Sequence, residues 1–271
     1  AQFQSAAKWT LHRNVSSSHL EYHYKLFYRF VSNANMIIHN IDNATGTQEE
    51  RDYIKGQALA YRAFAYFNLV QCWGGRYKAG ESNEQPGVIL RTDNSIDNLP
   101  RSSVEQVYTQ INEDLDNAIE LLSHVTTIKK VNKSHIDVHV ARGLKARVLL
   151  TQGKWLEAAE MAKKVVDESG AKLQDDTYVT TKNRMSDQNN TEWLWGKKGQ
   201  EDQAGTLKDF HSFMSNKNVS YNKNTPRAIY NLLYNKISDT DIRKTLWFPR
   251  AQDPKTTPKP IAPSGGYIRN Y

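Results

Sequence analysis

The sequence has very little cysteine and no long apolar run. Its single cysteine, Cys72, excludes a disulfide framework and a cysteine-based zinc site. Because Cys72 falls inside an apolar helical pattern, we expect it to be a buried free thiol. No apolar stretch approaches the ~20 residues that a membrane-spanning helix needs. The 271 residues are nevertheless enough to bury a sizeable core, so we expect one large domain that needs no disulfide or cofactor to hold it together.

Long runs of like charge are absent as well. The net charge is +7, but 36 basic residues are interspersed with 29 acidic ones, and the longest basic runs are pairs such as Lys129-Lys130. Such a distribution is typical of a solvated surface of mixed charge rather than of a groove that follows phosphates. We therefore expect no nucleic-acid partner. The opening residues also lack the pattern of a signal peptide, so they indicate no compartment.

The common catalytic and cofactor motifs are missing. There is no Gly-x-Ser-x-Gly segment and no Rossmann glycine triplet. Two histidine pairs have helical i, i+4 spacing, His19 with His23 and His135 with His139. In each pair the acid follows the first histidine by two residues, whereas zinc peptidases place it directly after. The sequence therefore predicts no metal site and no cofactor.

Apolar residues that alternate in steps of three and four predict long amphipathic helices. The first begins near Leu20. A second begins at a capping box of Thr47 and Glu50. It ends at Gly74-Gly75, because glycine adopts the left-handed backbone conformation at little energetic cost. Its two apolar faces indicate that it lies between two neighbours.

A further capping box, Ser102 with Glu105, predicts the next helix. After a polar loop at 123–137 we expect a pair of helices, the first ending at Gly153 and the second running from Trp155 to Glu168. This spacing is typical of a tetratricopeptide-like pair, with Trp155 in the core. Three small residues are expected on the inner face of the second helix: Ala158, Ala159 and Ala162.

Beyond Gly170 the helical periodicity fades. Residues 171–225 are rich in Asn, Asp, Thr, Lys and Gly, and they predict a loop-dominated lobe with a short strand-like segment at 192–195. A last helix is expected at about 227–235, before a tail rich in proline.

Aromatic residues are the most informative class, because six tryptophans and fourteen tyrosines exceed what the expected core requires. Each aromatic in a polar loop, taken alone, is as well explained by packing beneath that loop. As a set they are candidates for a stacking surface: Trp9, Trp193, Trp195, Tyr77, Phe210, Phe213, Tyr221 and Trp247.

A family resemblance appears in the helix at 56–67 and the Trp73-Gly74-Gly75 that follows it. This stretch resembles the signature helix of SusD/RagB-like proteins, which carries a Gly-Glu-Ala, an Arg-Ala, aromatic residues and a final aromatic-Gly. Other stretches are similar to that family in the same order: Tyr28 through Ala34-Asn35, Arg101 to Tyr108 with Asp114-Leu115, Ala146 to Leu150 with Gly153 and Trp155, and Asp241 with Arg243. One departure is Gln57, which stands where the family usually has Glu.

The resemblance implies a mostly α fold, a superhelix of tetratricopeptide-like helix pairs with a loop-rich lobe. We expect a single SusD-like domain over 1–271, with the helical scaffold at about 18–170 and the lobe at about 171–271. The family's lipidated N-terminal cysteine and a long C-terminal part are not seen, so we expect a chain shorter than its relatives.

The function implied by the resemblance is non-catalytic binding of a glycan or similar nutrient at the bacterial cell surface. Such proteins are outer-membrane lipoproteins of Bacteroidetes that serve polysaccharide utilization. The implied partners are an oligosaccharide and a SusC-like TonB-dependent transporter that receives it. Contact with the membrane would be made only through a lipid anchor that this chain does not contain.

The family holds its ligands with loop residues, which here correspond to the segment before the first long helix and to the variable segment after the helix pair. Trp9 offers a flat face for a sugar ring, while side-chain amides and guanidinium groups match hydroxyls. Trp9 is explained almost equally well as packing for the N-terminal arm. The predicted ligand-binding residues are Trp9, Arg13, Asn14, Phe213, Tyr221 and Asn222.

Two other classes of function stay open from the sequence. A helical-repeat scaffold for protein interaction would carry its aromatics and charges along the helices. A glycoside hydrolase would need two carboxyl groups at a fixed separation in a cleft. The pair Asp175-Asp176 could serve that chemistry, but in its loop it is better explained as solvated turn residues.

Overall fold

The computed structural model describes residues 8, 10–175, 190–197, 228–229, 231–242, 244 and 268–269. Contacts divide the chain into two units. The first comprises Ala1–Lys172 and Trp193–Gly196, and the second comprises Leu173–Glu192 and Lys197–Tyr271. Each unit is described by itself.

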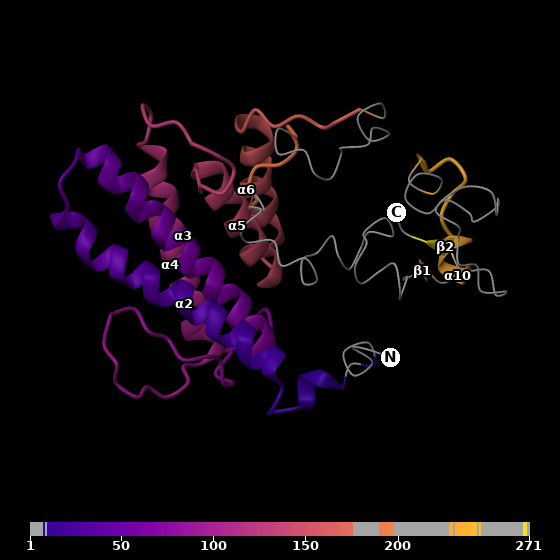
Figure 1. Cartoon of the computed structure of the whole chain (residues 1–271), viewed down its shortest axis with the longest axis horizontal. Coiled ribbons are helices and arrows are strands. Elements are labelled where there is room, and N and C mark those ends of the chain that lie inside the picture. Colours follow the sequence, from indigo (N-terminus) through magenta and orange to yellow (C-terminus); the bar gives the residue numbers. More distant parts are fainter. Residues whose placement is uncertain are drawn as a thin grey trace, which may run out of the picture. The chain divides into compact units, whose positions relative to one another are not determined.

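The first unit is a stack of helices (Figure 1). Helix α3 packs between α2 and α4, α5 packs against α4, and α6 pairs with α5. This arrangement confirms the predicted mostly helical fold with a tetratricopeptide-like pair. In chain order the elements are η1 (Leu11–Arg13), α2 (Ser18–Asn40), η2 (Ile41–Asn43), α3 (Gln48–Trp73), α4 (Val104–Ser123), α5 (Val138–Thr151) and α6 (Trp155–Glu168).

The described part of the second unit contains two short strands and one short helix. Strand β1 (Ala228–Ile229) pairs antiparallel with β2 (Ile268–Arg269), and α10 (Asn231–Tyr234) follows β1. The helix predicted at about 227–235 is therefore wrong in its first part, because Ala228 and Ile229 pair with a distant segment instead of continuing a helix.

Capping boxes begin both central helices. At α3 the Thr47 hydroxyl accepts a hydrogen bond from the Glu50 amide (3.2 Å), and the Thr47 amide donates to the Glu50 carboxylate (2.7 Å), as predicted. At α4 the box is Ser103 with Gln106, one residue later than predicted. The reason is that the backbone of Ser102 is already paired, its amide with Val88 and its carbonyl with Gly87.

The apolar core lies between α2, α3 and α4. Its largest fully buried side chains include Tyr66 and Leu69 of α3 and Tyr108, Ile111 and Leu115 of α4. The predicted double-faced character of α3 is confirmed, since it buries residues against both neighbours. Cys72 was predicted to be buried, but it is exposed together with its neighbour Gln71, because this side of the last turn of α3 faces solvent.

Helix α6 is much more exposed than predicted. The side chain of Trp155 is 66% exposed, and Ala159 and Ala162 are exposed as well. Only Ala158 and Val165 are buried on this helix, because α6 presents one face to α5 and no described residue covers the opposite face. The assignment of Trp155 to the core was therefore wrong.

Glycine ends α3 for a reason other than the one predicted. Gly74 has a φ of −95°, so it is not left-handed. A Cβ atom at this position would lie 2.7 Å from the Val70 carbonyl oxygen. The close approach of the backbone, rather than an unusual φ, requires glycine here.

The segment around Trp195 does not form the predicted strand. It lies against the helices of the first unit, where the Gly196 amide donates to the Lys133 carbonyl (2.9 Å). The Trp195 indole N–H donates to the Ser134 carbonyl (3.1 Å), and its ring lies 5.1 Å from that of Phe64. This aromatic residue of a polar loop is thus used for packing.

Substitution by alanine should change the free energy of unfolding in opposite directions at two helical glycines. A Cβ at Gly56 of α3 would lie 2.7 Å from Leu122 of α4, whereas at Gly143 of α5 no described atom beyond the helix's own backbone lies within 4 Å. We expect Gly56→Ala to lower the free energy of unfolding by about 1–3 kcal/mol through overpacking. Gly143→Ala should raise it by roughly 0.5–1 kcal/mol, because alanine favours the helix. Urea denaturation measures both, and equal effects of the two changes would contradict the close α3–α4 contact.

Candidate functional site

Two of the six predicted ligand-binding residues lie within the described part of the chain. Arg13 ends η1 with an exposed side chain, and Asn14 follows it just before α2. The Asn14 side-chain oxygen accepts a hydrogen bond from the Ser16 amide (3.0 Å), which fixes a local turn. The other four lie outside the described residues: Trp9, Phe213, Tyr221 and Asn222. The predicted ligand site therefore stays a prediction.

The first histidine pair lies on one helix, as its spacing predicts, whereas the second pair does not. The His23 ring bonds to the carbonyl of His19 (2.7 Å), one turn earlier in α2. His135 precedes α5 and bonds to the hydroxyl of Tyr53 (3.1 Å), so it does not share a helix with His139. Over the described residues, no three His, Cys, Asp or Glu side chains are grouped so that they could hold a metal ion.

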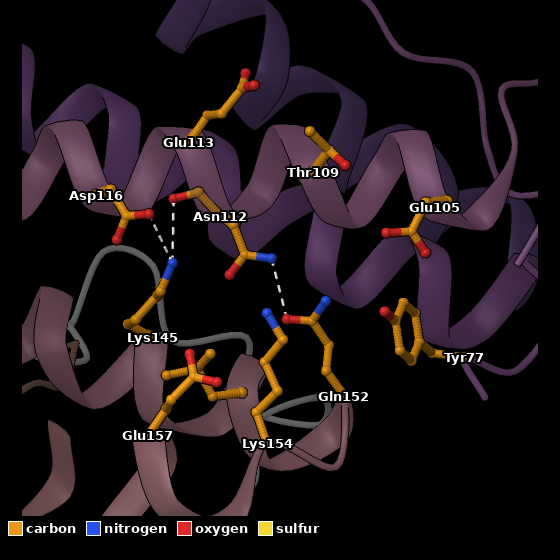
Figure 2. A pocket seen from close by; sticks show the side chains of 11 residues that line it. Tyr77, Glu105, Thr109, Asn112, Glu113, Asp116, Lys145, Gln152, Lys154 and Glu157 are labelled. Carbon is orange, nitrogen blue, oxygen red and sulfur yellow. Dashed lines mark hydrogen bonds and ion pairs between the residues drawn. The ribbon is translucent and has the colours of Figure 1, made fainter. Parts of the chain in front are cut away.

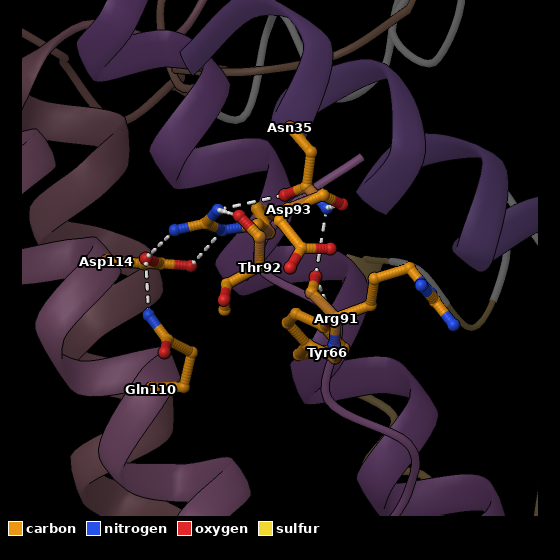
Figure 3. A network of polar contacts seen from close by, with 8 residues as sticks. Asn35, Tyr66, Arg91, Thr92, Asp93, Gln110 and Asp114 are labelled. Carbon is orange, nitrogen blue, oxygen red and sulfur yellow. Dashed lines mark hydrogen bonds and ion pairs between the residues drawn. The ribbon is translucent and has the colours of Figure 1, made fainter. Parts of the chain in front are cut away.

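Three residues from the family-like motifs meet in one buried network (Figure 3). Asn35 comes from α2, Arg62 from α3 and Asp114 from α4. The Arg62 guanidinium donates to both carboxylate oxygens of Asp114, at 2.8 and 2.6 Å, and to the Asn35 side-chain oxygen at 2.9 Å. Arg62 is 5% exposed and Asp114 is 1% exposed, so this is an ion pair in the interior.

The same network fixes the loop that connects α3 with α4. The Asn35 amide group donates to the carbonyls of Arg91 (2.9 Å) and Asp93 (2.8 Å). The Tyr66 hydroxyl donates to the Arg91 carbonyl and accepts from the Arg91 amide, both at 2.7 Å. Burial raises the pKa of Tyr66 to about 12, so the hydroxyl stays protonated and able to donate.

Burial and charge act against each other in this ion pair. Burial raises the pKa of the Asp114 carboxyl, and hydrogen bonds from Arg62 and Gln110 offset part of that rise. Burial alone would lower the pKa of Arg62, but the hydrogen bonds and charge of Asp114 raise it above its ordinary value. Because the charged groups are enclosed, the network joins helices and is not open to a ligand.

A cavity of about 340 Å³ lies on the other side of α4, between α4, α5 and the first turn of α6 (Figure 2). Helix α4 lines it with Glu105, Thr109, Asn112 and Asp116, which repeat in steps of four, three and four residues. These side chains therefore lie on one face of the helix. It is a polar stripe opposite the face that carries Asp114.

Helix α5 and the residue that caps its C-terminus supply the facing wall with two buried polar side chains. Lys145 is 7% exposed, and its ammonium group lies 2.9 Å from the Asp116 carboxylate. Gln152 is 5% exposed, and its side-chain oxygen accepts from the Asn112 amide group (3.0 Å). Tyr77 also lines the cavity, with its ring 4.7 Å from that of Tyr108.

This cavity was not predicted from the sequence, although the sequence contains a signal for it. The polar residues of α4 recur with helical spacing, and Lys145, Leu149 and Gln152 of α5 do the same. Only the packing of α4 against α5 shows that the two stripes face each other.

None of the described helices has the length and apolar content needed to cross a membrane.

The sequence model of one protein family, SusD-like and described as "Starch-binding associating with outer membrane", matches residues 1–150. The chain belongs to the SusD-like family. The match covers Asn35, Arg62 and Asp114, and it confirms the resemblance that the motifs predicted.

Several solved structures share the fold. A SusD-like carbohydrate-binding protein from Bacteroides vulgatus is 27% identical with a TM-score of 0.69, and the match covers 86% of this chain and 48% of the other. A putative sugar-binding protein from the same organism is 29% identical with a TM-score of 0.56, over 64% of this chain and 40% of the other. A structure solved with a xylogluco-oligosaccharide is 24% identical with a TM-score of 0.53, and the match covers 70% of this chain and 38% of the other.

The chain thus spans about half, or less, of the length of these solved structures. A comparison with proteins of curated description gave no match.

Replacing one partner of the buried ion pair should destabilise the protein more than replacing both partners. Arg62→Met leaves Asp114 buried without its cation, and we expect this change to lower the free energy of unfolding by about 3–5 kcal/mol. The double variant Arg62→Met with Asp114→Leu should recover much of that loss, because it removes both desolvated charges.

The exposed pair of Lys25 with Glu21 on α2 supplies the control. Lys25→Met should leave the unfolding midpoint in urea unchanged within error, because water screens an exposed ion pair. An Arg62→Met variant as stable as the Lys25→Met variant would contradict the structural role of the buried pair.

Proposed function

We propose that this protein binds a glycan at the outer surface of the bacterial outer membrane and passes it to a SusC-like TonB-dependent transporter, without cleaving it. The observation that carries the proposal is the family match over residues 1–150, whose description names starch binding and association with the outer membrane. The similar protein from Bacteroides vulgatus, described as carbohydrate-binding, supports the same class of ligand.

The helical unit is suited to act as a rigid support for ligand-binding loops. Its buried network fixes three helices and the segment at 91–93, so loops that leave this unit start from defined positions. Binding proteins commonly place their recognition residues on loops above such a scaffold. The loop residues proposed for the glycan are Trp9, Arg13, Asn14, Phe213, Tyr221 and Asn222.

Binding without hydrolysis fits the chemistry of the described carboxyl groups. A glycosidase needs an acid with a raised pKa beside the glycosidic bond, facing a second carboxylate. Burial does raise the pKa of Asp114, but this group is enclosed by Arg62 and Gln110. It therefore cannot reach a substrate.

One set of measurements separates glycan binding from the two rival functions. The protein is applied to a glycan array that includes xylogluco-oligosaccharides, and every glycan that binds is then incubated with the protein to detect release of reducing ends. We expect binding with no release. Catalytic release would establish a hydrolase, and binding to a peptide array but to no glycan would establish an interaction scaffold.

Trp9 should be required for glycan binding if it stacks on a sugar ring. With the best glycan from the array, we expect Trp9→Ala to weaken binding at least about tenfold in calorimetry, a change of about 1.4 kcal/mol, without lowering the melting temperature. The matched control is Trp155→Ala, which removes a tryptophan that is already largely exposed on α6.

The control variant should bind the glycan as the unmodified protein does. A lowered melting temperature with unchanged affinity for Trp9→Ala would assign Trp9 to packing of the N-terminal arm instead.

The partner is tested with the full-length protein in its own membrane. Purification through an affinity tag after gentle solubilisation should recover a β-barrel transporter in a fixed ratio. Recovery of a water-soluble partner alone would contradict the transfer of the glycan to a transporter.

A further inference from the structure

Two side-chain amide atoms that line the cavity between α4 and α5, one of Gln152 and one of Asn112, have no hydrogen-bond partner among the described residues. The Gln152 side-chain oxygen accepts a hydrogen bond from the Asn112 amide group. Across the described ranges, the Gln152 side-chain nitrogen has no hydrogen-bond partner, and Figure 2 shows it facing the space between Asn112 and Tyr77. Beside it the side-chain oxygen of Asn112 is buried and accepts no hydrogen bond from the described residues, which is unfavourable unless water or a ligand meets it.

A buried cation is fixed beside this donor. The Lys145 ammonium group lies 2.9 Å from Asp116 and 3.4 Å from the backbone carbonyl of Asn112. Since the flexible lysine side chain is held from both sides, it presents its charge at one place in the cavity wall.

The charges around the cavity restrict which ligand it can hold. Four carboxylates line it, from Glu105, Glu113, Asp116 and Glu157, together with the ammonium groups of Lys145 and Lys154. Within the described structure Lys145 pairs with Asp116, which leaves three carboxylates and one ammonium group of the cavity without an ion-pair partner there. An anion would be repelled by the carboxylates.

A metal cation is not favoured either, because two lysines line the cavity and no three metal-binding side chains are grouped within the described residues. Neutral hydroxyl groups fit best, since each can donate to a carboxylate or to the Asn112 oxygen and accept from Gln152 or a lysine. Tyr77 and Leu149 add apolar surface for the face of a ring.

We infer that this cavity is a second saccharide site, which holds one neutral sugar residue on the helical scaffold, apart from the loop residues proposed above. The inference rests on the proposed function, because the sugar would belong to the same class of ligand. A volume of about 340 Å³ is at the small end of the roughly 300–1,000 Å³ of ligand pockets, which suits one sugar ring rather than a chain.

The test uses methyl β-D-glucopyranoside as the probe and follows amide signals by NMR during titration. We expect shifts of the Gln152 side-chain amide and of backbone amides in α4, with a dissociation constant in the millimolar range, about 10⁻³ M or weaker. Thr109→Trp places a bulky ring at an exposed cavity position and should weaken this binding at least about tenfold.

The matched control is Asn117→Trp, at an exposed position of the same helix outside the cavity lining, and it should bind the probe as the unmodified protein does. Equal binding by Thr109→Trp, or no shift of the Gln152 amide, would overturn the site. Shifts with argininamide or gluconate in place of the neutral glycoside would overturn the class of ligand.

The oligosaccharide titration distinguishes this inference from the proposed function. If neither the unmodified protein nor any of the variants binds a glycan on the array, the proposed function fails. If the protein binds an oligosaccharide and loses it with Trp9→Ala while Thr109→Trp changes neither ligand, only the second site fails.

Discussion

A guanidinium group can remain in a protein interior only if its charge and its N–H groups find partners there. Arg62 meets this requirement with Asp114 of α4, Asn35 of α2 and, at 3.4 Å, the carbonyl of Thr92. Each partner comes from a different element, so the arrangement of α2, α3, α4 and the loop before α4 depends on a single buried side chain. Asn35 adds two bonds to that loop, at Arg91 and Asp93.

This constraint also determines the shape of the cavity. Asp114 is held against Arg62 on the buried face of α4, and Asn112 and Asp116 lie two residues to either side of it on the cavity face. Because α4 is fixed in rotation by Asp114, its polar stripe is held toward Lys145 and Gln152 of α5. The interior ion pair and the proposed sugar site thus lie on opposite faces of α4.

Much of the helical unit could be predicted from the sequence, because helix periodicity and capping are local. The bounds of α6 were predicted correctly, and the capping box of α3 was correct to the residue. The box of α4 was placed one residue early, because the pairing of Ser102 with Val88 depends on a distant segment.

The motif residues were recognised one by one, but their meeting could not be predicted. Arg62 lies 27 residues from Asn35 and 52 from Asp114 along the chain, and nothing local brings them together. Trp155 was assigned to the core because its sequence position is typical of a packed aromatic, whereas its exposure depends on which neighbours cover α6. The cavity escaped prediction for the same reason, since each of its polar stripes looks like a solvated helix face until the two are paired.

The central claim is that the network around Arg62 makes α2, α3, α4 and the segment at 91–93 one cooperative unit. Hydrogen exchange of backbone amides in an Asn35→Leu variant tests it most directly, since the change removes the Asn35 bonds to Arg62, Arg91 and Asp93 while it keeps the ion pair. The account predicts that slowly exchanging amides in all three helices lose protection by the same free energy. Faster exchange confined to the segment at 91–93, with α3 and α4 unchanged, would contradict it.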